Sequence, residues 1–279
     1  MRPPSANWFK EIEQSRDRVY NEETNGAFPI YPWLAPALHP KLRSLIERWG
    51  VEKELNAREP VLGQVNDKVD QLLLVRSGIT ARIFGSIYRQ ASPAMAFSVP
   101  GRLACGNLNF FSHRPCIGSY VAVVPSVVVC VPQSLVLRMC RSDADFALLV
   151  ASEFEKIALS DRLGFGLLAL LDIENRFLAF LLSWAVTFGH LEMQGDEGWV
   201  RMPLPLRGDA LRAVLNCSSA TLDRCLTALK QKGDYIVEGD VARVKLERLK
   251  PIHRWIRNCE ETTDAPPRVS LTNLFERIA

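Results

Sequence analysis

The strongest constraint on the fold lies between residues 203 and 234, in PLPLRGDALRAVLNCSSATLDRCLTALKQKGD. Apolar residues recur there at helical spacing on both sides of the short break Asn216-Cys217-Ser218. This pattern predicts two amphipathic helices joined by a tight turn, the spacing of a helix–turn–helix. Ser218 or Ser219 can cap the second helix, and Gly233 can close it.

A β-hairpin is predicted directly after these helices, because Tyr235-Ile236-Val237 and residues 241–246 flank the turn Glu238-Gly239-Asp240. Residues 201–258 carry a net charge of +6, whereas the rest of the chain carries −3. Positive charge on this segment suits contacts with DNA phosphates. The alternative is that the two helices form an ordinary helical hairpin inside a protein core. The predicted β-hairpin after them, which would form the wing of a winged helix–turn–helix, favours DNA binding over this alternative.

Other classes of protein find little support in the sequence. The seven cysteines have no CxxC or zinc-ligand spacing, so we expect no metal site. Their odd number without paired spacing predicts free thiols and a protein of the reducing cytoplasm. The first residues are too polar for a signal peptide. We expect no membrane span, because polar residues interrupt the apolar stretch 163–191. No paired carboxylates, nucleophile elbow or phosphate loop is found, so we do not expect an enzyme.

The first half of the chain changes character twice. Prolines 29, 32 and 36 forbid a continuous helix in the N-terminal arm, whose aromatic residues we expect to dock on the body. Residues 38–55 are predicted to form one helix with an apolar stripe. Residues 61–131 then alternate short β-prone runs (71–75, 79–87, 120–124, 127–131) with turn residues such as Ser77-Gly78, the pattern of an antiparallel jelly roll.

Helical periodicity returns at Gln133. A long helix is predicted after a cap at Ser142, and a second, Ile173 to Phe188, after a cap at Asp172, followed by a polar connection (189–198) and a short strand (199–202). The apolar stripe of the long helix has coiled-coil spacing, which makes it a candidate dimer interface; packing on the chain's own β domain is the alternative. The interface residues are Phe146, Leu149, Val150, Phe154, Ile157 and Leu168.

This order of elements resembles the bacterial Crp–Fnr family of transcription regulators. The clearest local matches are Leu171-Asp172-Ile173-Glu174-Asn175-Arg176 and Cys217-Ser218-Ser219-Ala220-Thr221-Leu222-Asp223-Arg224. The resemblance implies an α+β fold with an N-terminal antiparallel β-roll (jelly roll), a long dimerisation helix and a C-terminal winged helix–turn–helix. It divides the chain into an arm (1–37), a β-roll with leading helix (38–141), the dimerisation helix (142–171), a DNA-binding domain (172–250) and a tail (251–279).

The family's ligand sites match poorly. Members that bind cyclic nucleotides use a Gly-Glu pair and an Arg-Ser pair, where this chain has Gly106-Asn107 and Ile117-Gly118, followed by Ser119. An aliphatic side chain cannot pair with a phosphate, so we expect no cyclic AMP, although Arg114 could reach in after a loop shift. The chain has no cysteine before Cys105 to hold the family's N-terminal iron–sulfur cluster. Cys105 and Cys116, or His113, remain an alternative sensor.

The resemblance implies a cytoplasmic regulator that binds double-stranded DNA as a homodimer, with RNA polymerase as a further partner. Ser219 and Ala220 stand where family members that read G-rich half-sites carry an Arg and a Glu, so that consensus is not expected. A protein-interaction regulator without specific DNA binding is the alternative. The residues predicted to contact DNA are Ser218, Ser219, Ala220, Thr221, Arg224, Thr227 and Lys230.

Overall fold

The computed structural model describes residues 30–62, 68–84, 95–105, 109–112, 114–115, 118–195, 197–203, 206 and 208–259. The chain divides into two compact units. The first, here called the β-roll unit, is Leu34–Asp161, and the second, the C-terminal unit, comprises the residues from Arg162 onward together with those up to Trp33. Among the described residues, no helix has both the length and the apolar character needed to cross a membrane.

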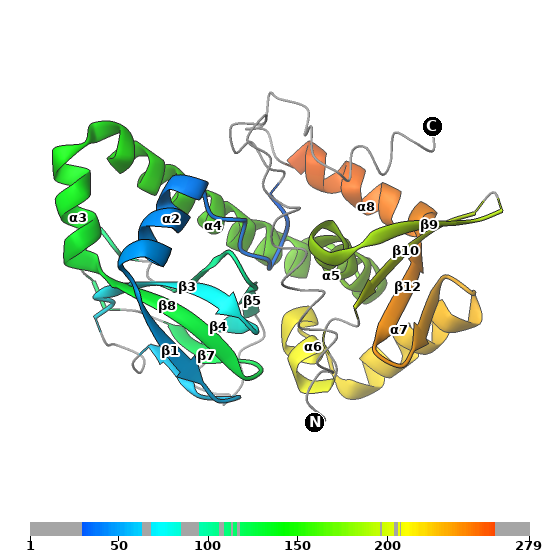
Figure 1. The fold of residues 1–279 in the computed structure, drawn as a ribbon. Helices are drawn as coiled ribbons and strands as arrows, with labels where there is room; N and C mark the ends of the chain where they lie inside the picture. The colour runs from blue at the N-terminus through cyan, green and yellow to red at the C-terminus, as the bar shows by residue number, and fades with distance from the viewer. Residues whose placement is uncertain are drawn as a thin grey trace. The chain divides into compact units, whose positions relative to one another are not determined.

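The β-roll unit contains two four-stranded antiparallel sheets (Figure 1). The first has the order β1 (Val51–Leu55), β8 (Ser126–Pro132), β3 (Gln71–Ser77) and β6 (Leu103–Cys105). The second has the order β2 (Pro60–Leu62), β7 (Gly118–Ala122), β4 (Thr80–Phe84) and β5 (Met95–Ser98). The predicted jelly-roll region is therefore confirmed as antiparallel sheet.

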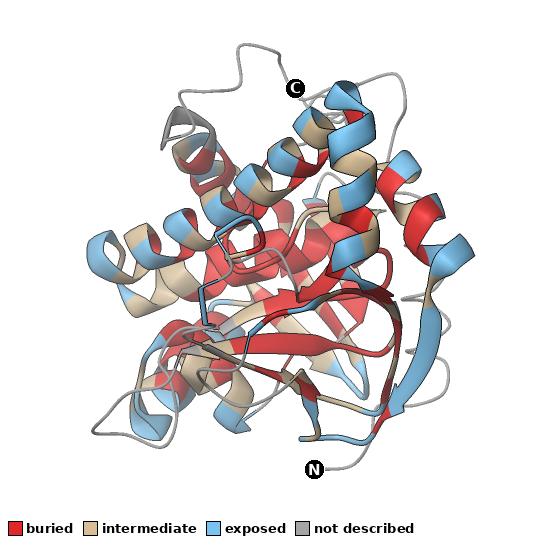
Figure 2. Cartoon of the chain, turned by 90° about the vertical axis from the view of Figure 1, so that its left-hand side faces the viewer, coloured by how far each residue is buried: buried red, intermediate tan, exposed pale blue. Residues whose placement is uncertain are grey.

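Strand β3 contributes its side chains alternately to two hydrophobic clusters. Leu72 and Leu74 belong to a cluster with residues of helices α2 (Pro40–Trp49), α3 (Gln133–Ser142) and α4 (Ala144–Leu170). Leu73 and Val75 belong to a second cluster, which includes Tyr120 of the other sheet. Successive strand side chains point to opposite faces, so β3 is buried on both. Figure 2 shows buried strands, one largely exposed strand, and helices that carry both buried and exposed residues.

The expected helix over residues 38–55 is wrong in its second half. Helix α2 ends at Trp49. After Gly50 the chain forms β1, which is an edge strand of its sheet and pairs with β8. Gly50 allows the change, because a Cβ there would lie 2.3 Å from Val129 Cγ1 and 2.5 Å from the Ile46 carbonyl oxygen. The VEKEL sequence of β1 has no strong preference of its own, and pairing with β8 determines its conformation.

Helix α4 is present as predicted, but its apolar stripe has a different partner. Phe146, Val150 and Ile157 are buried in the helix-side cluster of the β-roll unit, and Leu149 and Phe154 pack against that cluster. The stripe is therefore used inside the chain, as the alternative had it. Leu168 is half-buried. The residue that caps α4 is Asp143, not Ser142, since its carboxylate accepts a hydrogen bond from the Phe146 amide (3.0 Å).

The C-terminal unit surrounds helix α5 (Ile173–Phe188), whose bounds agree with the prediction. Its sheet has the order β11 (Tyr235–Glu238), β12 (Val241–Lys245), β10 (Glu197–Pro203) and β9 (His190–Gln194). The expected polar connection over 189–198 is wrong, because β9 and β10 pair as antiparallel strands there. Helices α6 (Gly208–Leu215), α7 (Ser219–Gln231) and α8 (Leu246–Cys259) complete the unit, and α8 extends into the predicted tail.

The end of the N-terminal arm docks as expected. Ile30, Tyr31 and Trp33 are buried, and Leu34 forms a parallel bridge with Phe97 of β5. The carbonyl of Ala35 accepts a hydrogen bond from the buried Arg102 guanidinium (2.6 Å). Burial lowers the pKa of Arg102 to about 9. Residues 1–29 of the arm lie outside the described residues.

Candidate nucleic-acid interface

Helices α6 and α7 form the predicted pair, joined by the turn 216–218. Asn216 makes the turn possible with a φ of 49°, a left-handed conformation that asparagine tolerates. Ser218 caps α7, because its hydroxyl accepts a hydrogen bond from the Thr221 amide (3.2 Å). The predicted cap is thereby confirmed, and the first turn of α7 is held by two short polar side chains (Ser218 Oγ to Thr221 Oγ1, 2.9 Å).

Helix α7 buries one face and exposes the other. Leu222, Cys225 and Leu229 are buried. At 100° per residue, the line opposite that face runs through Ala220, Arg224, Thr227 and Gln231, all of which are exposed. Among the residues predicted to contact DNA, those exposed are Ser218, Ser219, Ala220, Arg224, Thr227 and Lys230, whereas Thr221 is half-buried. Gln231 lies on this line and was missed.

The C-terminal end of α7 is fixed by its backbone. Gly233 has a φ of 67°, and the amide of Asp234 donates to the Leu229 carbonyl (3.0 Å). This is the hydrogen-bond pattern of a Schellman motif, which satisfies carbonyls that the helix leaves open. The predicted role of Gly233 is confirmed.

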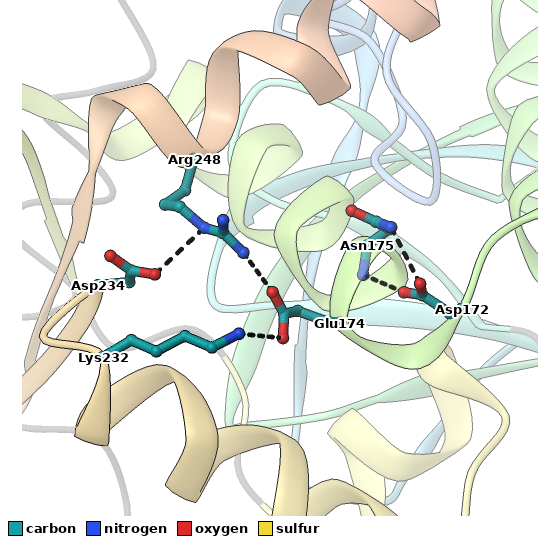
Figure 3. Close-up of polar contacts among 6 residues, drawn as sticks. All are labelled: Asp172, Glu174, Asn175, Lys232, Asp234 and Arg248. Atoms are coloured by element: carbon teal, nitrogen blue, oxygen red, sulfur yellow. Dashed lines mark hydrogen bonds and ion pairs between the residues drawn. The ribbon is translucent and has the colours of Figure 1, made fainter.

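A cluster of charges ties this end of α7 to α5 and α8 (Figure 3). Lys232 Nζ lies 3.2 Å from Glu174 Oε2, and the Arg248 guanidinium bonds the other oxygen of the same carboxylate. Arg248 Nε also lies 3.3 Å from Asp234 Oδ2. Glu174 stands in the first turn of α5 and Arg248 in α8, so three helices meet at one carboxylate.

The start of α5 is held by two side chains. Asp172 is the N-cap, as predicted, and accepts a hydrogen bond from the Asn175 amide (2.9 Å). Arg176 donates to three carbonyls, those of Leu171 (2.7 Å), Leu168 (2.7 Å) and Leu215 (3.2 Å). Carbonyls at helix ends lack intrahelical partners, so one guanidinium satisfies the ends of both α4 and α6. No pattern in the sequence pointed to this role.

The hairpin of β11 and β12 is present, but its tip is acidic. Glu238 and Asp240 flank Gly239 at the turn, and Glu238 pairs with Arg243 (2.8 Å). An acidic tip repels phosphate, so the positive charge of this unit is not concentrated there. The exposed cations Arg224, Lys230 and Lys232 instead lie on α7 and its cap.

The two thiols of this region are poorly reactive. Burial raises the pKa of Cys225 to about 11, and the nearby Glu174 carboxylate adds to the shift. Burial also raises the pKa of Cys217, against the effect of Arg176 and Arg212. Neither environment favours the thiolate form that redox chemistry requires.

The degenerate ligand cassette lies largely outside the described residues, which omit Gly106, Asn107, His113, Cys116 and Ile117. Arg114 is exposed, and Gly118 and Ser119 begin β7. Cys105 is buried in the cluster between the sheets. No group of three or more His, Cys, Asp or Glu side chains in the described part of the chain is placed to hold a metal ion.

No family model and no curated protein sequence matches the chain, but solved structures do. FixK2 from Bradyrhizobium japonicum is similar with a TM-score of 0.60 and 18% identity, over 74% of this chain and 96% of that one. The c-di-GMP responsive global regulator CLP of Xanthomonas campestris is similar with a TM-score of 0.56 and 17% identity, over 73% and 97%. For a CooA mutant from Carboxydothermus hydrogenoformans the values are 0.56 and 15%, over 76% and 90%.

These three structures are Crp–Fnr regulators, and each is matched over at least nine-tenths of its length. The likeness therefore spans both the β-roll and the unit that holds α6 and α7, which agrees with the order of elements described above. The chain has the fold of the Crp–Fnr transcription regulators.

Proposed function

We propose that the protein is a transcription regulator of Crp–Fnr type that inserts α7 into the major groove of DNA. The observation that supports this proposal most is the exposed face of α7, whose two ends are held by hydrogen-bonded caps. The residues of that face are Ala220, Arg224, Thr227 and Gln231. Arg224 is the cationic side chain among these four residues, and arginine is the residue that most often contacts guanine in the major groove. Asp223 is also exposed beside it and can accept a hydrogen bond from cytosine.

The test is binding to a duplex selected from a random pool, compared with a scrambled duplex, at two salt concentrations. Arg224→Ala should cost about 1–3 kcal/mol on the selected duplex and relax the preference at one position of each half-site. Arg254→Ala, an exposed arginine of α8, is the matched control and should leave base preference unchanged. A uniform loss on both duplexes would assign Arg224 to phosphate.

A protein-interaction regulator is the competing function, and the same experiment separates the two. Neutralisation of phosphates releases counterions, so DNA binding weakens steeply with salt. If wild-type protein shows no salt-dependent affinity for any duplex, the DNA-binding proposal fails.

We further propose that the regulator is a homodimer through the exposed face of α4. Leu148, Ala151, Glu155 and Ala158 follow one another on that face in steps of three and four residues, the spacing of a coiled-coil seam. Leu148 is 69% exposed, and contact with a second copy would remove this apolar side chain from water. A dimer would present two copies of α7 to half-sites about one helical turn apart.

We propose that neither cyclic AMP nor an iron–sulfur cluster takes part. Asn107 and Ile117 replace the charged ligands that the resemblance implies for a nucleotide, and no cysteine precedes Cys105. Calorimetry with cyclic AMP should give no saturable heat. Saturable binding would contradict the proposal and would implicate Arg114, which Arg114→Ala would then test.

A further inference from the structure

A buried ion pair joins the second sheet of the β-roll unit to α4. Arg82 on β4 bonds the carboxylate of Asp161, and the two side chains are 6% and 12% exposed. A guanidinium or a carboxylate alone at such a depth carries a large desolvation cost. Burial raises the pKa of Asp161, and the neighbouring Arg82 opposes that shift. We therefore expect the pair to hold α4 in one position against β4 and to add little net stability to the fold.

A small cavity lies beside this pair. Its volume is about 20 Å³, and polar side chains of Ser98, Tyr120 and Ser160 line it together with Arg82 and Asp161. Ser98 donates to the Leu103 carbonyl (2.6 Å) and Ser160 to the Leu34 carbonyl (3.1 Å), so both hydroxyls already hold the wall in place. A water needs roughly 10–15 Å³ of this kind of volume, which leaves room for about one water and no larger ligand.

The charges of the wall define which ligand would suit it. Arg82 is the one cation among the residues that line the cavity, and Asp161 is the one anion. The planar guanidinium fork matches a carboxylate in shape and in charge. A phosphate dianion would need further positive charge, which these wall residues do not supply. The guanidinium of Arg82 therefore suits a single small carboxylate. In the structure this carboxylate is the side chain of Asp161.

We propose that Arg82 forms a buried carboxylate-binding site that the chain fills with its own Asp161, so that α4 is anchored on the β-roll without an added ligand. Asp161 is the last residue of the β-roll unit, and α4 continues directly from it into the C-terminal unit. The anchor thus lies at the last residue of the β-roll unit. Removal of the Asp161 carboxylate should open the site to a free carboxylate of similar size.

The experiment is chemical rescue of Asp161→Ala in the full-length protein, followed by thermal unfolding in increasing sodium acetate. Acetate should bind this variant with a dissociation constant on the order of millimolar. At ten times that concentration it should raise the unfolding midpoint by about 3 °C. Sodium chloride at equal ionic strength and the neutral isostere acetamide should not. Wild-type protein and the double variant Arg82→Met/Asp161→Ala should not respond to acetate.

A control variant and a second measurement guard the interpretation. Asp145→Ala removes an exposed carboxylate from the same helix and should show no rescue. If Asp161→Ala does not fold in buffer alone, a higher refolding yield in acetate than in chloride gives the same answer. Equal effects of acetate and acetamide, or an acetate response of the double variant, would overturn the proposal. The same holds if the folded variant does not respond to acetate. Unfolding involves no DNA, so the result is independent of the proposed function.

Discussion

Gly78, between β3 and β4, is a position where the backbone and the space both require glycine. Its φ is 85°, and a Cβ would lie 2.2 Å from Ser126 Oγ and 2.6 Å from the Pro125 carbonyl oxygen. We expect Gly78→Ala to lower the free energy of unfolding by more than about 2 kcal/mol, because strain and a steric clash add. Equilibrium unfolding in urea measures the loss.

Gly239 at the hairpin tip is the matched control. Its φ is 60°, but a Cβ there would meet nothing within 4 Å. Gly239→Ala should therefore cost only the backbone strain, about 1 kcal/mol. Equal losses for the two variants would show that the contact with Ser126 relaxes without cost.

The thiol of Cys225 allows a prediction that depends on pH. Its pKa of about 11 means that roughly one molecule in a thousand carries the thiolate at pH 8, before the effect of burial on access. Alkylation by iodoacetamide should be much slower than for the unfolded protein, and the rate should rise with pH until about pH 11. Mass spectrometry of peptides over time measures this. A rate equal to that of the unfolded chain would contradict it.

At the scale of elements, sequence patterns located most helices and strands but not their partners. Local signals at Asp172, Ser218 and Gly233 placed helix ends, because caps act through neighbouring residues alone. Strands β1, β2, β5, β6 and β9 were missed, since each depends on pairing with a strand that local sequence does not reveal. Arg176 was missed as a structural residue for the same reason.

The cluster around Glu174 offers a test of how α7 is anchored. Glu174→Gln removes the charge that holds Lys232 and Arg248, and these groups are partly exposed and can be hydrated again. We therefore expect a loss of stability of about 1 kcal/mol, which decreases in high salt. Glu247→Gln, which breaks a pair within α8 alone, should cost less. Urea unfolding at low and high salt compares them, and equal small losses would show that Glu174 does not join the helices.

At the scale of the whole molecule, the order of elements carried more information than any single motif. The β-roll, the long helix and the paired helices α6 and α7 were each ambiguous alone, yet their order indicated the fold that the solved structures share. The apolar stripe of α4 shows the limit of such patterns. Its spacing predicts a buried face, but the same spacing serves a second copy or the chain's own sheet.

The two faces of α4 give opposite expectations for one kind of substitution. Ile157 is 8% exposed in the β-roll core, so Ile157→Asp should lower the free energy of unfolding by more than about 3 kcal/mol through an unpaired buried charge. Leu148 is 69% exposed, so Leu148→Asp should leave each protomer folded and remove only the contact with a second copy.

Light scattering decides between these outcomes, with circular dichroism as the measure of folding. Wild-type protein should have the mass of a dimer, and Leu148→Asp should have the mass of a folded monomer. A wild-type monomer would refute the dimer proposal, whereas a Leu148→Asp dimer would place the interface elsewhere. If Ile157→Asp instead yields a folded monomer that loses no more free energy of unfolding than Leu148→Asp, Ile157 contacts the second copy and not the core, because an unpaired charge in the core would be costly.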